Sequence, residues 1–577
     1  MLRIYRNLRP VDWLLIVVIV GFTIGQVWCT MSIVDYLQNA INAITTSDVS
    51  GIWYNGGIML AFAVGCALFQ VGCCFVAAYV AGDMSARIRT KLFNKVESFS
   101  IAEVNKFSTA SLITRSTNDV QQVQMANVMI LRMLIAAPVT IIWAICKIST
   151  TNASLTWATV IAVVALIAIL VVVVMVALPK TRIMQKLTDR LNSVTRENLT
   201  GIRVVRAYNA EEYQNKKFDK ANNDFTKTQI FTNVVLGLLS PVIMLIMNGV
   251  SLAIYIIGGN LMNAGEIDYA TVTSFMMLAS QVIMSFMMLL MMFVMLPRAQ
   301  VAARRINVVM DTPASIHDPE TEAEPTEEGT VEFRDVCFRY PDADNDAIKN
   351  VSFRIEKGQT LAFIGATGSG KSTLINLIPR FYDVTEGQVL VDGVDVRDMK
   401  QKTIHEKIGF VPQKGILFSG TVAENIGYAG ITDMDAITHA AKIAEADGFI
   451  NEMTDAYESE IAQGGSNVSG GQKQRLCIAR AICAKPEIAI FDDSFSALDF
   501  KTDKQVRDNL REELKDTTSI IVAQRIGTIM DADKIVVLEN GAAVGIGTHQ
   551  ELLESCQTYR DIALSQLSAE ELGLCQG

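Results

Sequence analysis

Six apolar stretches in the first half of the chain constrain its fold more than any other feature. Each is long enough to cross a lipid bilayer as a helix, which takes about 20 residues. Inside a bilayer such a segment satisfies its own backbone polar groups only as a helix, so the first half is predicted to be an all-helical membrane domain with six spans. The spans lie near Trp13–Val34, Gly56–Val80, Asn127–Cys146, Leu155–Leu178, Val234–Gly258 and Thr271–Leu296.

The positions of lysine and arginine orient these spans. Neither residue occurs between Arg9 and Arg87 or between the fifth and sixth spans, whereas the segments after spans two and four are basic and Lys147 is the exception. Because cytoplasmic loops carry the excess of Lys and Arg, the chain is predicted to be a multi-pass protein of the cell (plasma) membrane with both termini cytoplasmic. The basic segments 85–99 and 184–199 have helical periodicity, so long helices are expected to continue past the membrane.

The second half differs from the first in charge. Residues 1–310 hold 25 Lys and Arg against 15 Asp and Glu, a balance of +10, and the remainder has a balance of −20, which gives the net charge of −10. This division favours a membrane domain over 1–310 and an acidic, water-soluble domain over 331–577. Segment 311–330, "DTPASIHDPETEAEPTEEGT", is rich in Pro, Glu and Thr and is predicted to be an exposed linker. No basic patch indicates a nucleic-acid partner.

The segment "LAFIGATGSGKSTLINLI" over 361–378 is the strongest indication of chemistry in the chain. An apolar strand leads into a glycine-rich loop and then a helix, in the pattern G-x-x-x-x-G-K-[ST], whose backbone N–H groups wrap phosphate oxygens. Lys371 is expected to neutralise the β- and γ-phosphates of ATP, and the Ser372 hydroxyl to bind Mg²⁺. The predicted ATP-binding residues of this loop are Gly365, Thr367, Gly368, Ser369, Gly370, Lys371, Ser372 and Thr373.

The segment "EIAIFDD" over 487–493 is predicted to be a buried strand that ends in Asp492. A carboxylate at this position of a P-loop nucleotide hydrolase holds the shell of the bound Mg²⁺. The second half is therefore predicted to be an α/β P-loop domain.

The segment "NVSGGQKQRLCIARA" over 467–481 resembles the signature of ATP-binding cassette (ABC) proteins, whose common form is LSGGQ. Small residues at a helix N-terminus suit a phosphate. In this family two cassettes enclose two ATP molecules, and the resemblance implies that the signature acts on the partner's ATP. Val468 stands in place of the Leu, and the other signature residues, Ser469, Gly470, Gly471 and Gln472, are intact.

Further elements of the chain match the family in order. Tyr340 resembles the aromatic residue that stacks on adenine, and Gln413 resembles the glutamine that touches Mg²⁺, so the implied Mg²⁺ ligands are Ser372, Gln413 and Asp492. The segments "LITRSTNDV" (112–120) and "TGIRVVRAYNAEE" (200–212) resemble the exporter-type membrane domain. The loop that crosses the cassette interface corresponds to Ser496, Ala497, Leu498 and Asp499.

Two residues depart from the family pattern. Asp493 stands where an active cassette has a Glu, and its carboxylate would fall about 1.5 Å short, a displacement that can cost roughly a hundredfold in rate. Gln524 stands where the switch strand has a His, and a Gln side chain cannot carry a positive charge. Both belong to the ATP of this chain's own P-loop, whereas the elements lent to a partner are preserved. The pattern resembles the subunit with the degenerate ATP site in heterodimeric multidrug exporters.

The resemblance implies ATP-driven export of small amphipathic molecules, with ATP and Mg²⁺ as cofactors and a second half-transporter chain that carries the standard Glu and His. Lipids and peptides are the next substrates considered. Two other functions remain open at this point, an ATP-gated channel or sensor and an importer with the same fold. The eight methionines between Met276 and Met295 either line an adaptable pocket for apolar substrates or face lipid and neighbouring helices.

Overall fold

The computed structural model describes residues 3–151, 153–341 and 343–572 and divides into two compact units. Unit 1 comprises Met1–Glu97 and Ala110–Thr312, and unit 2 comprises Ser98–Thr109 and Pro313–Gly577. The described regular elements of unit 1 are all helices, and unit 2 carries all the described strands. The predicted fold class, a helical membrane domain followed by an α/β nucleotide-binding domain, is confirmed.

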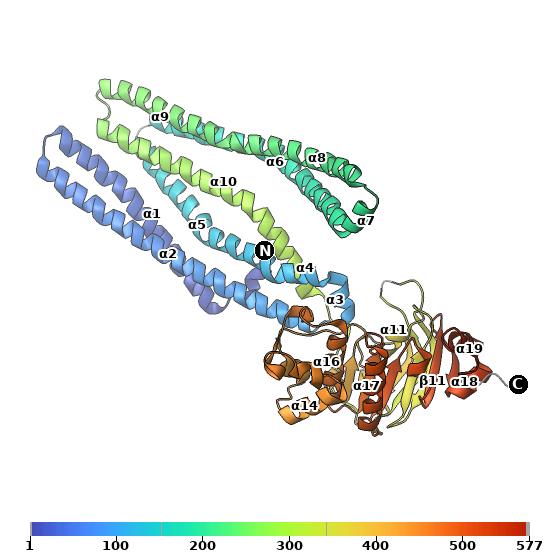
Figure 1. Ribbon diagram of the computed structural model, residues 1–577. Coiled ribbons are helices and arrows are strands. Elements are labelled where there is room, and N and C mark those ends of the chain that lie inside the picture. The colour runs from blue at the N-terminus through green and yellow to red at the C-terminus, as the bar shows by residue number, and fades with distance from the viewer. Residues whose placement is uncertain (1–2, 152, 342, 573–577) are drawn as a thin grey trace. The chain divides into compact units, whose positions relative to one another are not determined.

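Unit 1 consists mainly of long helices, several of which lie side by side in Figure 1. Five helical segments in the described part of the chain are long and apolar enough to span a membrane: Pro10–Thr45, Val49–Glu97, Thr109–Ser149, Glu211–Asn263 and Tyr269–Leu289. The fourth predicted span falls on a shorter apolar stretch, Leu155–Ile169. The elements are η1 (Ile4–Asn7), α1 (Pro10–Thr45), α2 (Val49–Glu97), α4 (Thr109–Thr114), the π-helical turn η2 (Arg115–Asp119), α5 (Val120–Thr151), α6 (Ala153–Thr200), α7 (Ile202–Ala207), α8 (Glu211–Gly237), α9 (Leu239–Asn263) and α10 (Tyr269–Asp311).

Two of these helices are much longer than a bilayer requires. Helices α2 and α6 have 49 and 48 residues, so each extends well beyond the roughly 30 Å of the hydrocarbon core. The amphipathic segment 184–199 lies within α6, and segment 85–99 forms the end of α2 as far as Glu97. Both helices thus continue past the length that a span needs.

Buried charges join the first two helices of unit 1. Asp12, in the first turn of α1, is 2% exposed and accepts a hydrogen bond of 2.7 Å from the Arg9 backbone N–H. Its carboxylate pairs with the guanidinium of Arg87 on α2, which also pairs with Asp83. Lys147, the basic residue that breaks the charge pattern, pairs with Asp35 on α1. Asp12, Arg87 and Lys147 therefore each have a charged partner on the same helix or another helix of unit 1.

The methionines of α10 divide between packed and exposed positions. Met276 and Met287 pack against buried apolar clusters of unit 1, whereas Met277, Met284 and Met288 are exposed. The side chains of Met291 and Met295 lie outside the described part of the structure. Both interpretations of the methionines therefore stay open.

Unit 2 is built on a six-stranded sheet in the order β12-β11-β3-β10-β9-β6, in which only β12 is antiparallel to its neighbour. A four-stranded antiparallel sheet has the order β2-β1-β4-β5, and β7 pairs with β8. The strands are β1 (Val331–Phe338), β2 (Ile348–Ile355), β3 (Thr360–Ile364), β4 (Glu386–Val391), β5 (Val394–Asp395), β6 (Ile408–Val411), β7 (Gly420–Thr421), β8 (Glu460–Ile461), β9 (Ile488–Asp492), β10 (Thr518–Val522), β11 (Lys534–Glu539) and β12 (Ala542–Gly547).

Helices pack around these sheets and enclose three buried apolar clusters. One of these clusters is the core of a mainly helical lobe around α16. One face of α16 is buried in it. The helices are α3 (Ile101–Phe107), α11 (Lys371–Ile375), α12 (Gln401–Lys407), α13 (Val422–Ile426), α14 (Met434–Ile443), α15 (Asp447–Asn451), α16 (Gly470–Cys483), α17 (Phe500–Glu513), α18 (His549–Ser555) and α19 (Gln557–Leu564), with 3-10 turns η3 (Val396–Asp398), η4 (Ala456–Glu458), η5 (Gln463–Gly465) and η6 (Ile526–Thr528).

The predicted linker 311–330 has no helix or strand after α10 ends, but it is fastened to unit 2 over much of its length. Asp318 accepts a hydrogen bond from the Gln401 backbone N–H at 3.0 Å. The backbone N–H of Thr326 donates to the carbonyl of Asp392 at 3.0 Å. Asp392 is fully buried and pairs with Lys407 at 2.5 Å. Segment 315–330 is therefore a strap along the cassette rather than a free tether.

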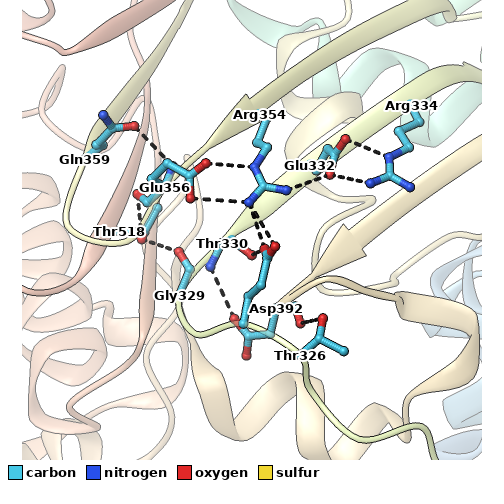
Figure 2. Close-up of polar contacts among 11 residues, drawn as sticks. Thr326, Gly329, Thr330, Glu332, Arg334, Arg354, Glu356, Gln359, Asp392 and Thr518 are labelled. Carbon is cyan, nitrogen blue, oxygen red and sulfur yellow. Dashed lines mark hydrogen bonds and ion pairs between the residues drawn. The ribbon is translucent and has the colours of Figure 1, made fainter.

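Figure 2 shows how the end of this strap joins the first strands. Arg354 on β2 donates to Glu356 at 2.8 Å and to Glu332 on β1 at 3.2 Å. It also donates to Glu327 of the strap at 3.0 Å. The Thr330 backbone N–H donates to the Asp392 carboxylate at 3.2 Å. These bonds hold the strap and the four-stranded sheet together.

Candidate nucleotide site

The predicted ATP-binding residues meet at one edge of the six-stranded sheet. Strands β3, β10 and β9 are parallel neighbours, so their carboxyl ends and the loops that follow them lie together. The glycine-rich loop follows β3, Asp493 follows β9 and Gln524 follows β10. The Ser372 hydroxyl of α11 donates to the Asp492 carboxylate at 3.0 Å, which joins the loop to the end of β9.

Two glycines shape the loop for different reasons. A Cβ on Gly365 would lie 2.2 Å from the carbonyl oxygen of Leu538, so only glycine fits between β3 and β11. Gly368 has a φ of +84°, and a Cβ there would meet no atom within 4 Å. The loop therefore borders open space at Gly368, as a phosphate cradle requires.

The hydroxyl of Ser369 faces the same loop without a partner among the described residues. Ser369 is 4% exposed, and its Oγ makes no hydrogen bond there. A buried hydroxyl without a partner costs about 1–3 kcal/mol. A phosphate oxygen in the cradle would supply an acceptor, so the residues present fit a bound nucleotide.

The charges of the site are arranged for a ligand that is both anionic and metal-bound. Lys371 donates to the carbonyls of Gly365 and Ala366 at 2.7 and 2.9 Å. Burial lowers the pKa of the Lys371 ammonium, against the opposing effect of Asp493 and Asp492. Burial also raises the pKa of the Asp492 carboxyl. Because burial penalises both charged forms, phosphates beside Lys371 and a cation beside Asp492 would relieve both penalties.

The residues that would hold Mg²⁺ supply two oxygens in contact with each other, from Ser372 and Asp492. The third predicted ligand, Gln413, donates to the carboxylate of Asp493, the residue after Asp492, at 3.4 Å. In the described part of the chain no three His, Cys, Asp or Glu side chains form a metal site by themselves. Mg²⁺ binds in nucleotide sites through one or two protein oxygens together with phosphate oxygens and water, which matches this set.

The two residues that depart from the family pattern touch each other. Gln524 donates through Nε2 to Oδ2 of Asp493 at 2.7 Å, and Gln413 donates to the same oxygen at 3.4 Å. Asp493 is 9% exposed and has a φ of +46°, a conformation that Asp adopts more readily than most residues. The two amides therefore occupy an oxygen that the attacking water would need to reach.

Tyr340, the predicted adenine-stacking residue, lies in an aromatic cluster. Its hydroxyl is 3.0 Å from Oγ1 of Thr373 in α11. Its ring meets the ring of Tyr382 edge to face at 5.4 Å and that of Phe338 at 4.9 Å. Sequence reasoning missed Tyr382, since no motif marks this position and only the fold brings it to Tyr340.

The signature residues lie at the exposed start of α16, where Ser469 is the N-cap. The Ser469 hydroxyl accepts from the Gln472 backbone N–H at 3.3 Å, and the Gln472 side chain accepts from the Ser469 N–H at 2.8 Å. This reciprocal cap fixes the helix start. Ser469 and Gly470 are exposed, whereas Val468 is 8% exposed and belongs to the core of the helical lobe. Val468 can replace a Leu because its role here is packing.

The predicted interface loop lies beside the signature. A Cβ on Gly471 would be 3.3 Å from the carbonyl oxygen of Ala497. Ser496 and Ala497 are exposed, Leu498 is buried, and Asp499 caps α17 by accepting from the Thr502 N–H at 3.0 Å. This bond holds the pKa of the Asp499 carboxyl below its usual value. The signature and the loop thus form one exposed surface whose geometry is set by two helix caps.

Comparison with protein families agrees with this division of the chain. Residues 14–286 match the ABC transporter transmembrane region, and residues 348–496 match the ABC transporter domain. An uncharacterized ABC transporter ATP-binding protein of Mycobacterium tuberculosis is 37% identical over 538 residues, which cover 92% of this chain and 92% of that protein. The chain belongs to the ABC transporter family, and its second unit is the ATP-binding domain that drives transport by hydrolysis.

Other relatives match most of the length of the chain. The protein YfiB of Bacillus subtilis, an uncharacterized ABC transporter ATP-binding protein, is 34% identical over 545 residues, 92% of this chain and 93% of its own length. A fatty acid ABC transporter ATP-binding/permease protein of Mycobacterium tuberculosis is 31% identical over 474 residues, 82% of this chain and 75% of its own. A bacterial Atm1-family ABC exporter with ATP bound has the same fold, with a TM-score of 0.79, 22% identity and coverage of 96% and 97%.

Proposed function

We propose that this chain is one half of a two-chain exporter of small amphipathic molecules, and that its own ATP site binds ATP and hydrolyses it slowly. The partner is a second half-transporter with the standard Glu and His. The chain lies in the plasma membrane with both termini cytoplasmic, as the basic segments after spans two and four favour.

The contact between Gln524 and Asp493 carries this proposal. A general base must lie within hydrogen-bond reach of the attacking water and must be able to take up its proton. The Asp493 carboxylate is one methylene shorter than Glu, and its Oδ2 already accepts from two amides. An amide in place of the His also brings no positive charge to the γ-phosphate. ATP would therefore be held in this site by Lys371, Ser372 and the loop, and turned over slowly.

The exposed signature supports the second half of the proposal. Ser469 and Gly470 lie at a capped helix N-terminus, where backbone N–H groups and the helix dipole attract an anion. Ser469, Gly470, Gly471 and Gln472 are intact, so the chain keeps the polar residues that it would lend to the ATP of another cassette. A partner with a complete base would hydrolyse that ATP.

An amphipathic cargo is supported by the methionines of α10 and by one relative. Thioether side chains adapt to apolar molecules of varied shape. The mycobacterial relative named for fatty acids indicates a cargo with an apolar body and a polar head.

The first test asks which site carries the hydrolysis. The tagged chain is extracted with its partner from the native membrane, and ATP turnover is compared for Ser469→Asp and Asp493→Asn. Aspartate is as good an N-cap as serine, so Ser469→Asp keeps α16 folded but places a negative charge against the partner's γ-phosphate. We expect Ser469→Asp to lower turnover at least about tenfold and Asp493→Asn to change it less than about twofold.

The outcome separates the functions considered above. A second chain of similar size in equal amount, with the complete base, is expected. A homodimer whose turnover falls with Asp493→Asn would contradict the proposal. Accumulation of a fluorescent amphipathic dye inside inside-out vesicles marks an exporter, and its loss from them marks an importer. A channel carries the dye only down its gradient.

A further inference from the structure

The loop that carries Gln524 is held from outside by the C-terminal segment of the cassette. Gln566, two residues after α19 ends, donates through Nε2 to the carbonyl oxygen of Gln524 at 2.8 Å. Its Oε1 accepts from the backbone N–H of Ile526 at 2.9 Å. One side-chain amide thus bridges two residues of the loop and holds the backbone on both sides of Arg525.

The C-terminal segment is itself anchored on both sides of Gln566. Ala563, in the last turn of α19, is fully buried, and Leu567 packs against the same apolar cluster of the cassette. Ile526 of the loop is fully buried in that cluster as well. Because apolar contacts hold the main chain before and after it, the exposed Gln566 side chain bonds the loop from a fixed position.

A second bond holds the other end of the loop to α17. Nη1 of Arg507 donates to the carbonyl oxygen of Gly527 at 3.1 Å. The guanidinium of Arg507 also donates twice to the buried carboxylate of Asp503, at 3.0 and 3.1 Å. The loop therefore has anchors on two elements, and of these Gln566 is the one bonded to Gln524 itself.

The backbone position of Gln524 decides what its side chain can reach. Its Nε2 donates to Oδ2 of Asp493 at 2.7 Å. A glutamine side chain is long and flexible, and ordering it in one contact costs conformational entropy. While Gln566 fixes the carbonyl of Gln524, only the side-chain torsions remain to be ordered. Without Gln566 the backbone would move as well, and Oδ2 of Asp493 would be open to water for more of the time.

We propose that Gln566 is a positioning residue that keeps this ATP site slow, because it fixes the loop from which Gln524 covers the Asp493 carboxylate. This inference rests on the proposed function, in which the site hydrolyses ATP slowly. It adds a restraint by the C-terminal segment to the replacement of Glu and His. Part of the slow rate is then relieved by a substitution that leaves every residue at the phosphates unchanged.

The experiment measures hydrolysis in this site, on the full chain with its partner in lipid nanodiscs. Single-turnover rates with radiolabelled ATP and excess enzyme are compared in the Ser469→Asp background, which silences the partner's ATP. The variants are Gln566→Ala, Gln524→Ala and the two together. Amide hydrogen exchange over 523–528 measures separately whether the loop has been released.

Two further variants sharpen the comparison. Gln566→Glu keeps an acceptor for the Ile526 N–H but has no proton to donate to the carbonyl of Gln524. Gln557→Ala is the matched control, because Gln557 is also an exposed glutamine of the C-terminal segment. Its side chain donates to Asp561 within α19 at 2.7 Å.

We expect Gln566→Ala to raise the rate by about 2- to 10-fold, the range of one hydrogen bond, and to speed exchange over 523–528. Gln524→Ala raises the rate within the same range, since it also uncovers Asp493. The double variant is no faster than the faster single one, because both changes remove the same contact. Gln566→Glu raises the rate as Gln566→Ala does, and Gln557→Ala changes neither quantity. Since damage to the fold would lower the rate, a gain identifies positioning.

The unfavourable results point to different conclusions. A site that hydrolyses ATP as fast as the partner's site, before any change at Gln566, overturns the proposed function and this inference together. A rate that is unchanged or lower in Gln566→Ala overturns this inference alone, because the loop would then not restrain Asp493. Gains from Gln566→Ala and Gln524→Ala that multiply in the double variant also overturn it, since Gln566 would then act through another residue.

Discussion

Gln524 donates a hydrogen bond of 2.7 Å to the carboxylate of Asp493, so the two departures from the family pattern meet at one oxygen atom. In sequence they are separate substitutions that follow separate strands, β9 and β10. In space they form a single unit, an acid held by an amide at the place where water would be activated. Their effects on hydrolysis should therefore not be additive.

Restoring the Glu and the His of the family pattern should make this site hydrolyse ATP faster. In a Ser469→Asp background, which silences the partner's ATP, Asp493→Glu with Gln524→His is expected to raise single-turnover hydrolysis by about 10- to 100-fold. Each change alone should give much less, because Glu without His would still accept from Gln524. Radiolabelled ATP in excess enzyme measures the rate. No gain in the double variant would mean that the base is not what limits this site.

Substitutions of the two loop glycines should have different effects. Gly365→Ala should lower the stability of the fold, and Gly368→Ala should weaken the binding of ATP. Gly365→Ala forces a Cβ to 2.2 Å from the Leu538 carbonyl, so strand β11 must move and the unfolding temperature should fall by several degrees. Gly368→Ala meets no neighbour and costs only about 1 kcal/mol of backbone strain, but its methyl enters the phosphate cradle.

Calorimetric unfolding with and without Mg²⁺ and ATP distinguishes these cases. Gly368→Ala should unfold close to the wild type without nucleotide and lose most of the stabilisation by ATP. Equal stabilisation by ATP in Gly368→Ala and wild type would show that the cradle lies elsewhere.

His549 should make the cassette less stable in mild acid. Burial lowers the pKa of its imidazole, against a smaller opposite effect of Asp531. The unfolded chain then binds the proton more readily, so stability is complete above the unfolded value of 6.5 and is lost as the pH falls through it. The drop in unfolding temperature between pH 7.5 and pH 5.5 should be smaller for His549→Gln than for the wild type. An unchanged drop would assign the acid sensitivity to other groups.

The ion pair between Asp12 of α1 and Arg87 of α2 should matter for folding mainly because losing one partner leaves the other charge buried. Arg87→Met leaves Asp12 buried and uncompensated, which costs about 3–5 kcal/mol. We expect little folded chain after mild detergent extraction, measured by size-exclusion chromatography. Asp12→Asn together with Arg87→Met removes both charges and should recover most of the folded yield. Normal yield from Arg87→Met alone would mean that Arg87 is not the group that compensates Asp12.

Much of the fold and of the site follows from local sequence patterns. The strand before Gly365, the helix after Gly370 and the strand that ends in Asp492 are each marked by periodicity and glycine spacing. The meeting of these elements follows from parallel strand order, which places successive carboxyl ends at one edge. The charge asymmetry between the two halves likewise marks the membrane domain.

Contacts between distant elements could not be predicted in this way. Nothing in the sequence pairs Ser100 with Ser315, because the helix that Ser100 caps is separated from the strap by most of the membrane domain. The hydrogen bond from Gln524 to Asp493 depends on side-chain conformations at the ends of β10 and β9, for which periodicity gives no rule. The π-helical turn Arg115–Asp119 in front of α5 also has no pattern in the residues that form it.

The strap at 315–330 has a consequence for engineering of the chain. Composition alone suggests a slack connector of about twenty residues, into which a tag or protease site could be placed harmlessly. With the chain fastened from Ser315 onward, residues 312–314 are the only length left to flex after α10 ends. The part of the connector that carries no such bond is therefore three residues long, and an insertion beyond Ser315 would have to displace the strap from the cassette.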